Sequence, residues 1–382
     1  MWRALASNAL TLVAVALFLL GGLILWGRGE YTRAGPLEQA ICFRVEGGAR
    51  PGEVARALAA RGAVTNARLF VLGLDYTGRD SALKAGNFRL PAEASMAAIA
   101  ELLSGDGRST CGAEAALRIG VTASEIELRE IEPVGNRYVT LARFDAGGDP
   151  PAAYLDRRDD PELRFRVVLA EGVTSARAVA ALMAADFLTG TVEAPPPEGS
   201  LAPQSYQVAR SMDRAALIAR MQAVQEAILA ELWPERAEEL PFDTPEDALI
   251  LASIVEKETA VAEERPLVAS VFVNRLTAGM RLQSDPTVIY AITRGERTLE
   301  RGLRQSELRR DTSWNTYVNA GLPPTPIANP GREAIAAVLN PAETEYLYFV
   351  ADGSGGHAFA KTLAEHNRNV ARWREIEAQG GE

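Results

Sequence analysis

Two glutamates at the end of an apolar run, Glu256 and Glu258, have the clearest catalytic potential in this sequence. The run extends from Ala248 to Val255, and Lys257 separates the two acids. A carboxyl group at the edge of an apolar helix face loses part of its hydration, which disfavours its charged form. Such a group can stay protonated near neutral pH and act as a general acid. Both glutamates fall beside apolar residues on a helical wheel, so their spacing does not show which of them is the acid. A solvated, charged helix end without a catalytic role fits the same pattern.

A helix that begins at Thr244 is predicted to carry these acids. Pro245 suits a first helical turn, and Glu246 and Asp247 are favoured by the partial positive charge of a helix amino terminus. The candidate acids would then lie at the carboxyl end of this helix.

Polar clusters and rigid loops follow the helix, and they are candidates to line a cleft for a hydroxyl-rich ligand. The clusters contain Gln283, Asp285, Asn315 and Tyr317, and one of the loops is Asn329-Pro330-Gly331. Asp-Pro and Asn-Pro pairs are also common in turns and loops, so a purely structural role fits them as well.

Two copies of a strand, turn and helix pattern precede the helix. The first copy reads Phe43-Arg44-Val45 and then Glu46-Gly47, and the second reads Phe165-Arg166-Val167 and then Glu171-Gly172. A further strand and helix follow each copy, so an internal duplication is credible.

A hairpin is predicted between the two copies. The segments 126–128 and 138–141 have the composition of strands, and they flank Pro133-Val134-Gly135-Asn136, which is typical of a turn.

The amino-terminal segment has the properties of a membrane anchor. Residues 4–27, 24 in all, carry no charge. As a helix they would reach about 36 Å, enough to cross a hydrocarbon core of about 30 Å. Trp2 and Trp26 suit the two interfaces. A cleaved signal peptide is the alternative, but the apolar run is longer than usual and no A-x-A site follows it. A retained anchor is therefore expected.

Composition excludes several classes of function. Acidic residues outnumber basic ones by 50 to 40, and the net charge of -10 argues against broad capture of nucleic acid. Two cysteines and two histidines are too few for a Cys/His metal cage at any recognised spacing, so no metal or other cofactor is expected. Cys42 and Cys111 either pair in an oxidising compartment or remain free thiols.

Five linked motifs make the chain resemble the YceG-like (MltG) family of endolytic murein transglycosylases. The resemblance is dense from about 244 to 373 and looser over the two modules. The motifs are Ala-Ser-Ile-Val-Glu-Lys-Glu-Thr at 252–259, Val-Phe-Val-Asn-Arg-Leu at 271–276, the run 280–290, Gly-Leu-Pro-Pro at 321–324, and 346–353 with His357, Phe359 and Glu365-His366-Asn367.

The resemblance implies an α+β protein with a single transmembrane helix, small LysM-like modules and a C-terminal α+β catalytic domain. Where the family tends to read Pro-Glu-Gly-Tyr-Leu-Phe-Pro-Asp-Thr-Tyr, this chain has Pro-Glu-Gly-Ser-Leu-Ala-Pro-Gln-Ser-Tyr at 197–206. The expected domains are a cytoplasmic tip and anchor at 1–30, a first LysM-like module at 41–107, an insertion with the predicted hairpin at 108–164, a second LysM-like module at 165–240 and a YceG-like catalytic domain at 241–382.

The resemblance also implies a substrate, a site and a location. The family cuts nascent peptidoglycan strands between N-acetylmuramic acid and N-acetylglucosamine and leaves 1,6-anhydromuramyl ends, which limits strand elongation. By match to Ile-Val-Glu-Lys-Glu, Glu256 is the expected catalytic acid, with Gln283, Asp285, Asn315 and Tyr317 as expected sugar contacts. The expected location is the inner (cytoplasmic) membrane, with the catalytic domain on the periplasmic side. Glycan strands, the membrane and peptidoglycan synthases are the expected partners.

Two other functions fit the sequence. A hydrolytic muramidase would pair Glu256 with a second carboxylate, for which Asp285 is the available candidate, because ordinary glycoside hydrolysis uses two carboxyl groups. A non-catalytic, glycan-binding scaffold of the wall-synthesis machinery would use the anchor and the two modules alone.

Overall fold

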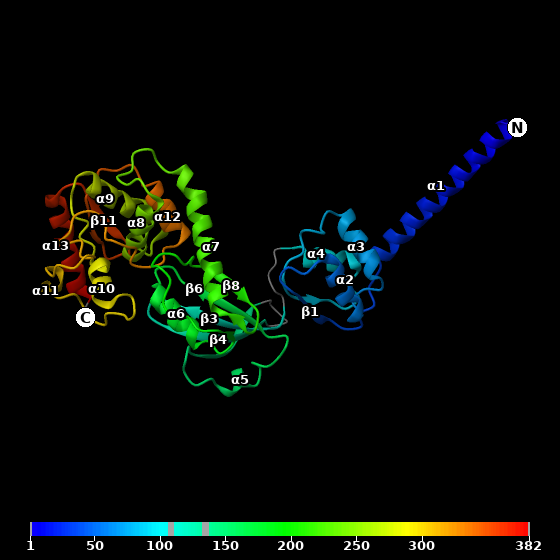
Figure 1. Cartoon of the computed structure of the whole chain (residues 1–382), viewed down its shortest axis with the longest axis horizontal. Helices are drawn as coiled ribbons and strands as arrows, with labels where there is room; N and C mark the ends of the chain where they lie inside the picture. Colours follow the sequence, from blue (N-terminus) through cyan, green and yellow to red (C-terminus); the bar gives the residue numbers. More distant parts are fainter. Residues whose placement is uncertain (1, 106–110, 132–136, 381–382) are drawn as a thin grey trace. The chain divides into compact units, whose positions relative to one another are not determined.

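The computed structural model describes residues 2–105, 111–131 and 137–380, and it confirms the predicted mixed α+β class (Figure 1). The helices and strands form two compact units. The candidate acids and the second module both belong to unit 2. Unit 1 comprises Met1–Ala113, Arg129–Leu141 and Asp159–Leu163, and unit 2 comprises Glu114–Leu128, Ala142–Arg158 and Arg164–Glu382.

Unit 1 contains the first module. Strands β1 and β2 pair antiparallel, which brings Phe43 opposite Phe88 in a buried apolar core. Cys42 on β1 forms a disulfide with Cys111, so the paired state is the correct one of the two alternatives. The elements of this module are β1 (Ile41–Val45), α2 (Pro51–Ala60), α3 (Ala67–Tyr76), β2 (Gly86–Leu90) and α4 (Met96–Leu103).

The segment predicted as an anchor forms one helix, α1 (Trp2–Thr32). Within the described part of the chain, no helix has the combined length and apolar character that a membrane span requires.

A five-stranded sheet joins the predicted insertion to the second module. Strand β3 runs parallel to β6, with Ala115 opposite Phe165, and β6 pairs antiparallel with β8. Strands β4 and β5 are neighbours, as the predicted hairpin requires, whereas the predicted turn at 133–136 lies outside the described residues. The sheet order is β5 (Tyr138–Asp145), β4 (Ser124–Ile131), β3 (Ala113–Ile119), β6 (Arg164–Leu169) and β8 (Ser205–Val208).

The second module repeats the order of the first. In each copy a strand and a helix are followed by a second strand and helix, and the two strands pair antiparallel. The first copy has α3 as an additional helix, whereas the second has a longer irregular segment before β8. The further elements of the second module and the insertion are α5 (Ala152–Leu155), α6 (Ser175–Ala184), β7 (Leu188–Thr189), β9 (Met212–Asp213) and α7 (Arg214–Leu232).

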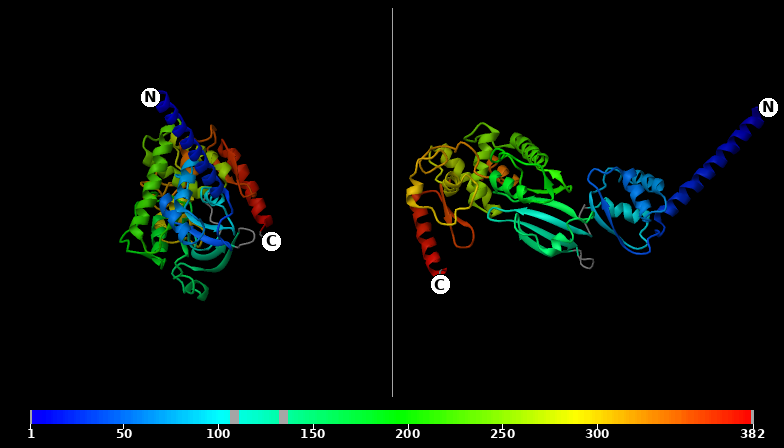
Figure 2. Two further views of the ribbon diagram at one scale, coloured as in Figure 1. Left: turned by 90° about the vertical axis from the view of Figure 1, so that its right-hand side faces the viewer. Right: turned by 60° about the horizontal axis from the view of Figure 1, so that its bottom comes forward.

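Helices dominate the C-terminal half of unit 2. Helices α8, α9 and α12 lie side by side and share one buried apolar core (Figure 1). The hairpin β10–β11 packs against α13 (Figure 2). The elements are α8 (Pro245–Glu258), α9 (Arg265–Thr277), α10 (Asp285–Thr293), α11 (Gln305–Leu308), α12 (Arg332–Leu339), β10 (Tyr348–Ala351), β11 (His357–Ala360) and α13 (Leu363–Gly380).

Candidate functional site

Helix α8 positions both candidate acids. It begins as predicted, because the Thr244 hydroxyl accepts a hydrogen bond from the backbone N–H of Asp247 at 3.1 Å and Pro245 occupies the first turn. Residues 250–255 are buried in the core that α8 shares with α9 and α12. The helix ends at Glu258, so the two acids occupy its last turn, at the edge of this core.

Glu258 has the properties of a general acid. Burial raises the pKa of its carboxyl to about 7, with a further increase from the charge of Asp285. The Ser284 hydroxyl donates a hydrogen bond to Glu258 Oε1 at 2.5 Å, and this bond opposes the increase, as do the charges of His357 and Arg275. With a pKa near 7, a large fraction of this carboxyl keeps its proton at neutral pH.

Two of the predicted sugar contacts meet beside Glu258. The Tyr317 hydroxyl donates to Asp285 Oδ1 at 2.7 Å, and Asp285 is the first residue of α10. Burial raises the pKa of Tyr317, and the hydrogen bond to Asp285 and the charges of Asp285 and Glu258 raise it further, so its hydroxyl stays protonated and remains a donor. Gln283 precedes this cluster, with an exposed side chain and a left-handed φ of 52°. The structure therefore groups Asp285 and Tyr317 with Glu258, and Gln283 lies next to them in the chain.

Asn315 is bonded within its own loop. Its side chain is fully buried, and its amide nitrogen donates to the backbone carbonyls of Glu307, Leu308 and Arg310. Its amide oxygen accepts the backbone N–H of Tyr317 at 2.9 Å. Asn315 therefore shapes the loop that presents Tyr317, and its direct contact with a sugar stays a prediction.

Glu256 has different neighbours. Its Oε2 accepts the backbone N–H of Gly331 at 2.9 Å, and its Oε1 lies 3.9 Å from Arg265 Nη2. The same Arg265 nitrogen lies 3.3 Å from Glu171 Oε2, in the second module. Burial raises the pKa of Glu256, and the charge of Glu171 adds to this increase, whereas the Gly331 hydrogen bond and the charges of Arg265 and Lys257 oppose it.

The two acids therefore face different parts of unit 2. Residues two apart on a helix lie about 200° around its axis, so they point to roughly opposite sides. On the side of Glu256, the Lys257 ammonium donates to the carbonyl of Gly172 at 3.3 Å. The backbone at Gly331 approaches the Glu171 carboxylate closely, since a Cβ there would require the Glu171 side chain to move.

Spacing alone did not assign roles to Ser284, Arg275 or His357, which the structure brings toward Glu258 from three different segments. Arg275 is buried and donates to the backbone carbonyls of Leu282 and Leu347, which fixes its charge in place. The available signal in the sequence was that all three residues fall within the family motifs.

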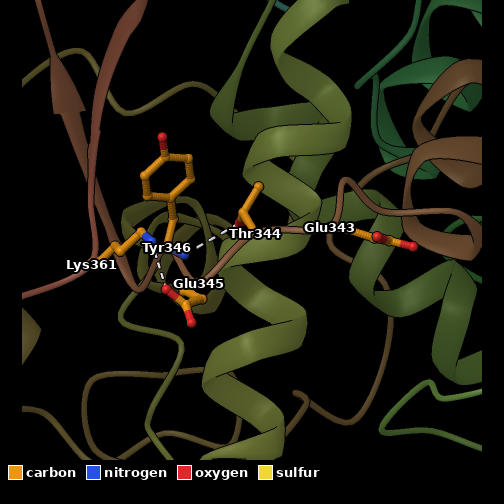
Figure 3. Close-up of a pocket in the computed structure, with 5 residues that line it drawn as sticks. All are labelled: Glu343, Thr344, Glu345, Tyr346 and Lys361. Carbon is orange, nitrogen blue, oxygen red and sulfur yellow. Dashed lines mark hydrogen bonds and ion pairs between the residues drawn. The ribbon is translucent and has the colours of Figure 1, made fainter.

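Two surface pockets lie apart from Glu256 and Glu258, and His357 lines one of them. One, with a volume of about 410 Å³, is formed by residues around Tyr346, where Lys361 pairs with Glu345 at 2.6 Å (Figure 3). The other, of about 510 Å³, lies between the turn at 353–356 and Trp373 on α13. Neither has Glu256 or Glu258 among its lining residues. In the described ranges, no group of three or more His, Cys, Asp or Glu side chains is arranged to hold a metal ion.

Comparison with known proteins identifies relatives. An endolytic murein transglycosylase of Bacillus subtilis is 46% identical over 120 residues, which is 31% of this chain and 32% of that protein. An endolytic murein transglycosylase of Streptococcus pneumoniae is 35% identical over 179 residues, which is 46% of this chain and 32% of that protein. The matched region thus spans about a third of the length of these curated relatives.

A solved structure and a family model also match. The crystal structure of a yceG-like protein from Listeria monocytogenes covers 86% of this chain and 98% of that chain, at 23% identity and a TM-score of 0.45. The model of the YceG-like family matches residues 43–372, which is most of the 382-residue sequence. On this match, the chain belongs to the YceG-like family.

Proposed function

We propose that this protein is a lytic transglycosylase that cleaves peptidoglycan strands internally, between N-acetylmuramic acid and N-acetylglucosamine. The observation that carries the proposal is the Glu258 carboxyl, whose pKa of about 7 suits proton donation, beside the Asp285–Tyr317 pair. The relatives named endolytic murein transglycosylase support the substrate class. Cleavage within strands would limit their elongation.

The proposed reaction uses one carboxyl group twice. Protonated Glu258 donates its proton to the glycosidic oxygen as the bond to C1 breaks. The resulting carboxylate then takes the proton of the C6 hydroxyl of the same muramyl residue, and this oxygen attacks C1. The product has a 1,6-anhydro bond, no water is consumed, and Glu258 regains its proton. The Asp285 carboxylate and the Tyr317 hydroxyl oxygen can accept hydrogen bonds from sugar hydroxyls, because the Tyr317 proton is donated to Asp285.

The assignment of the acid to Glu256 stays a prediction, and the geometry favours Glu258. The Glu256 carboxylate accepts the Gly331 N–H and lies 3.9 Å from Arg265 Nη2, and both interactions favour its charged form. Asp285 and Tyr317, two of the four predicted sugar contacts, adjoin Glu258 instead. For the same reason the muramidase alternative would now pair Glu258 with Asp285.

The identity of the reaction products tests the proposal. Digestion of uncrosslinked glycan is expected to give fragments with anhydro ends, which are one water lighter than hydrolytic products and do not react with borohydride. Mass spectrometry before and after borohydride treatment measures this. Mostly reducible ends would instead establish the muramidase, with Asp285 as its second carboxylate. Glycan that is bound but left intact would favour the non-catalytic scaffold.

Membrane anchoring belongs to the same proposal. Large apolar side chains of α1 between Leu17 and Trp26 are more than half exposed, which suits a lipid environment. The Cys42–Cys111 disulfide supports an oxidising compartment for unit 1. We therefore place the protein in the inner membrane by a single N-terminal helix, with the catalytic domain in the periplasm. LysM-like glycan binding by the two modules fits their repeated order of elements, and peptidoglycan synthases are proposed partners because they make the strands.

A fusion of alkaline phosphatase to the carboxyl terminus is expected to be active, because this reporter folds only outside the cytoplasm. A cytoplasmic reporter fused at the same point serves as the control and is expected to be inactive. If the cytoplasmic reporter were the active one, the proposed location would be wrong and the protein would not meet peptidoglycan.

A further inference from the structure

Glu198, in the irregular segment before β8, uses both oxygens of its carboxyl group to join two parts of unit 2. Its Oε1 accepts the backbone N–H of Ser175 at 2.7 Å, at the amino terminus of α6. Its Oε2 accepts the hydroxyl of Tyr290, on α10, at 3.2 Å. One carboxyl group therefore connects the second module to the helix that begins with Asp285.

The module side of this connection is held in place. A carboxylate at a helix amino terminus is stabilised by the unpaired N–H groups and the partial positive charge there. The amide of Asn329, itself fully buried, lies 3.5 Å from Glu198 Oε1. The same amide donates to the carbonyl of Val173 and accepts the N–H of Leu201, both at 2.9 Å. Hydrogen bonds from Ser175 and Asn329 thus hold the Glu198 carboxyl on the side of the second module.

A second contact holds the other end of α10. The Thr174 hydroxyl donates to the carbonyl of Gly295, just beyond the helix, at 2.5 Å. Gly295 has a left-handed φ of 74°, and a Cβ at this position would collide with the Thr174 side chain. The second module therefore holds α10 at Tyr290 and at Gly295.

The position of α10 matters because its first residue is Asp285. Asp285 binds Tyr317, and its charge acts on Glu258. Ser284, the N-cap residue of α10, donates to Glu258 directly, whereas Arg275 comes from α9 and His357 from β11. A shift of α10 would therefore move both Ser284 and Asp285 relative to Glu258 and leave Arg275 and His357 in place.

We propose that Glu198 is a positioning residue of the catalytic site, which holds α10 and thereby sets Asp285 against Glu258. The inference rests on the proposed function for its catalytic meaning, since Glu198 itself touches no reacting atom. On this inference the second module holds α10 in place through Glu198 and Thr174, in addition to any binding of glycan.

The test measures the pKa of Glu258 by carbon-13 NMR titration of the full chain and, separately, the cleavage rate. Tyr290→Phe removes only the hydroxyl that binds Glu198, and Glu198→Ala removes the carboxyl. In both variants α10 is expected to move away from Glu258, which weakens the Ser284 hydrogen bond more than it reduces the effect of the Asp285 charge, so the pKa of Glu258 rises by roughly half a unit. The alkaline limb of the pH–rate profile moves up with it, and kcat falls about tenfold because the site is misplaced.

Tyr206→Phe is the matched control. It removes a buried hydroxyl that binds the carbonyl of Ala202 within the second module and does not contact α10. The pKa of Glu258 is expected to be the same in this variant as in the native protein. Glu198→Gln keeps an oxygen for Ser175 and is expected to leave the pKa of Glu258 closer to its native value than Glu198→Ala does.

An unchanged pKa of Glu258 in Tyr290→Phe would overturn the inference, as would an equal shift in Tyr206→Phe. The titration needs no turnover, so it decides the inference even for a protein that does not cleave glycan. Loss of the proposed function and loss of this positioning role therefore give different results.

Discussion

Glu258→Gln is expected to lower the rate of glycan cleavage by about 10²–10⁴-fold, which is the usual contribution of a general acid. Glutamine keeps the size of the side chain and an oxygen that can accept the Ser284 hydroxyl, but it has no proton to donate. Because these contacts are kept, the fold is expected to stay intact, as circular dichroism can check. The rate is measured on uncrosslinked glycan as anhydro ends formed per minute.

Glu256→Gln is the matched control on the same helical turn. The amide oxygen of glutamine can still accept the N–H of Gly331, so the loop before α12 is kept and substantial activity is expected. The reverse result, with Glu256→Gln inactive and Glu258→Gln active, would return the catalytic role to the residue that the family motif indicates.

The pH dependence of the native protein gives a second measure of the same acid. The proposed reaction needs protonated Glu258, whose pKa is raised to about 7, mainly by burial. The value of kcat/KM is therefore expected to fall as pH rises through about 7. A rate that stayed constant up to pH 9 would exclude Glu258 as the proton donor.

Local signals in the sequence predicted the elements that carry the site. The start of α8 follows from Thr244 and Pro245 because capping and first-turn preferences depend on neighbouring residues only. Strands β1 and β6 were found from the repeated Phe-Arg-Val pattern for the same reason. In each case the interaction that forms the element lies within a few residues of it.

The arrangement of the site depended on contacts that the sequence does not encode locally. A helical wheel identifies the apolar face of α8, but it does not show that Glu256 faces Arg265 and Glu258 faces Ser284. Asn315 is a residue type that often binds ligands, but its amide nitrogen donates to nearby backbone carbonyls instead. Strand β3 of the insertion pairs with β6 of the second module, so both belong to one sheet. The paired residues lie about 50 apart in the sequence, and no local pattern indicates this pairing.

Replacement of both cysteines by serine, Cys42→Ser with Cys111→Ser, is expected to destabilise unit 1 by about 4 kcal/mol. The disulfide joins residues 69 apart, so it restricts the unfolded chain strongly. Serine is close to cysteine in size, and the buried core around Phe43 and Phe88 is not otherwise changed. Hydrogen exchange of backbone amides in β1, β2 and α4 measures the loss as lower protection.

Native protein treated with a thiol reductant should show the same loss of protection in unit 1, because reduction opens the same loop without changing any residue. Unit 2 has its own core around α8, α9 and α12, so its amides are expected to keep their protection in both cases. Equal loss in unit 2 would show that the two units unfold together, and no loss in unit 1 would show that its apolar core alone maintains the fold. The expected result makes the first module dependent on an oxidising compartment, whereas the general acid on α8 is independent of the redox state.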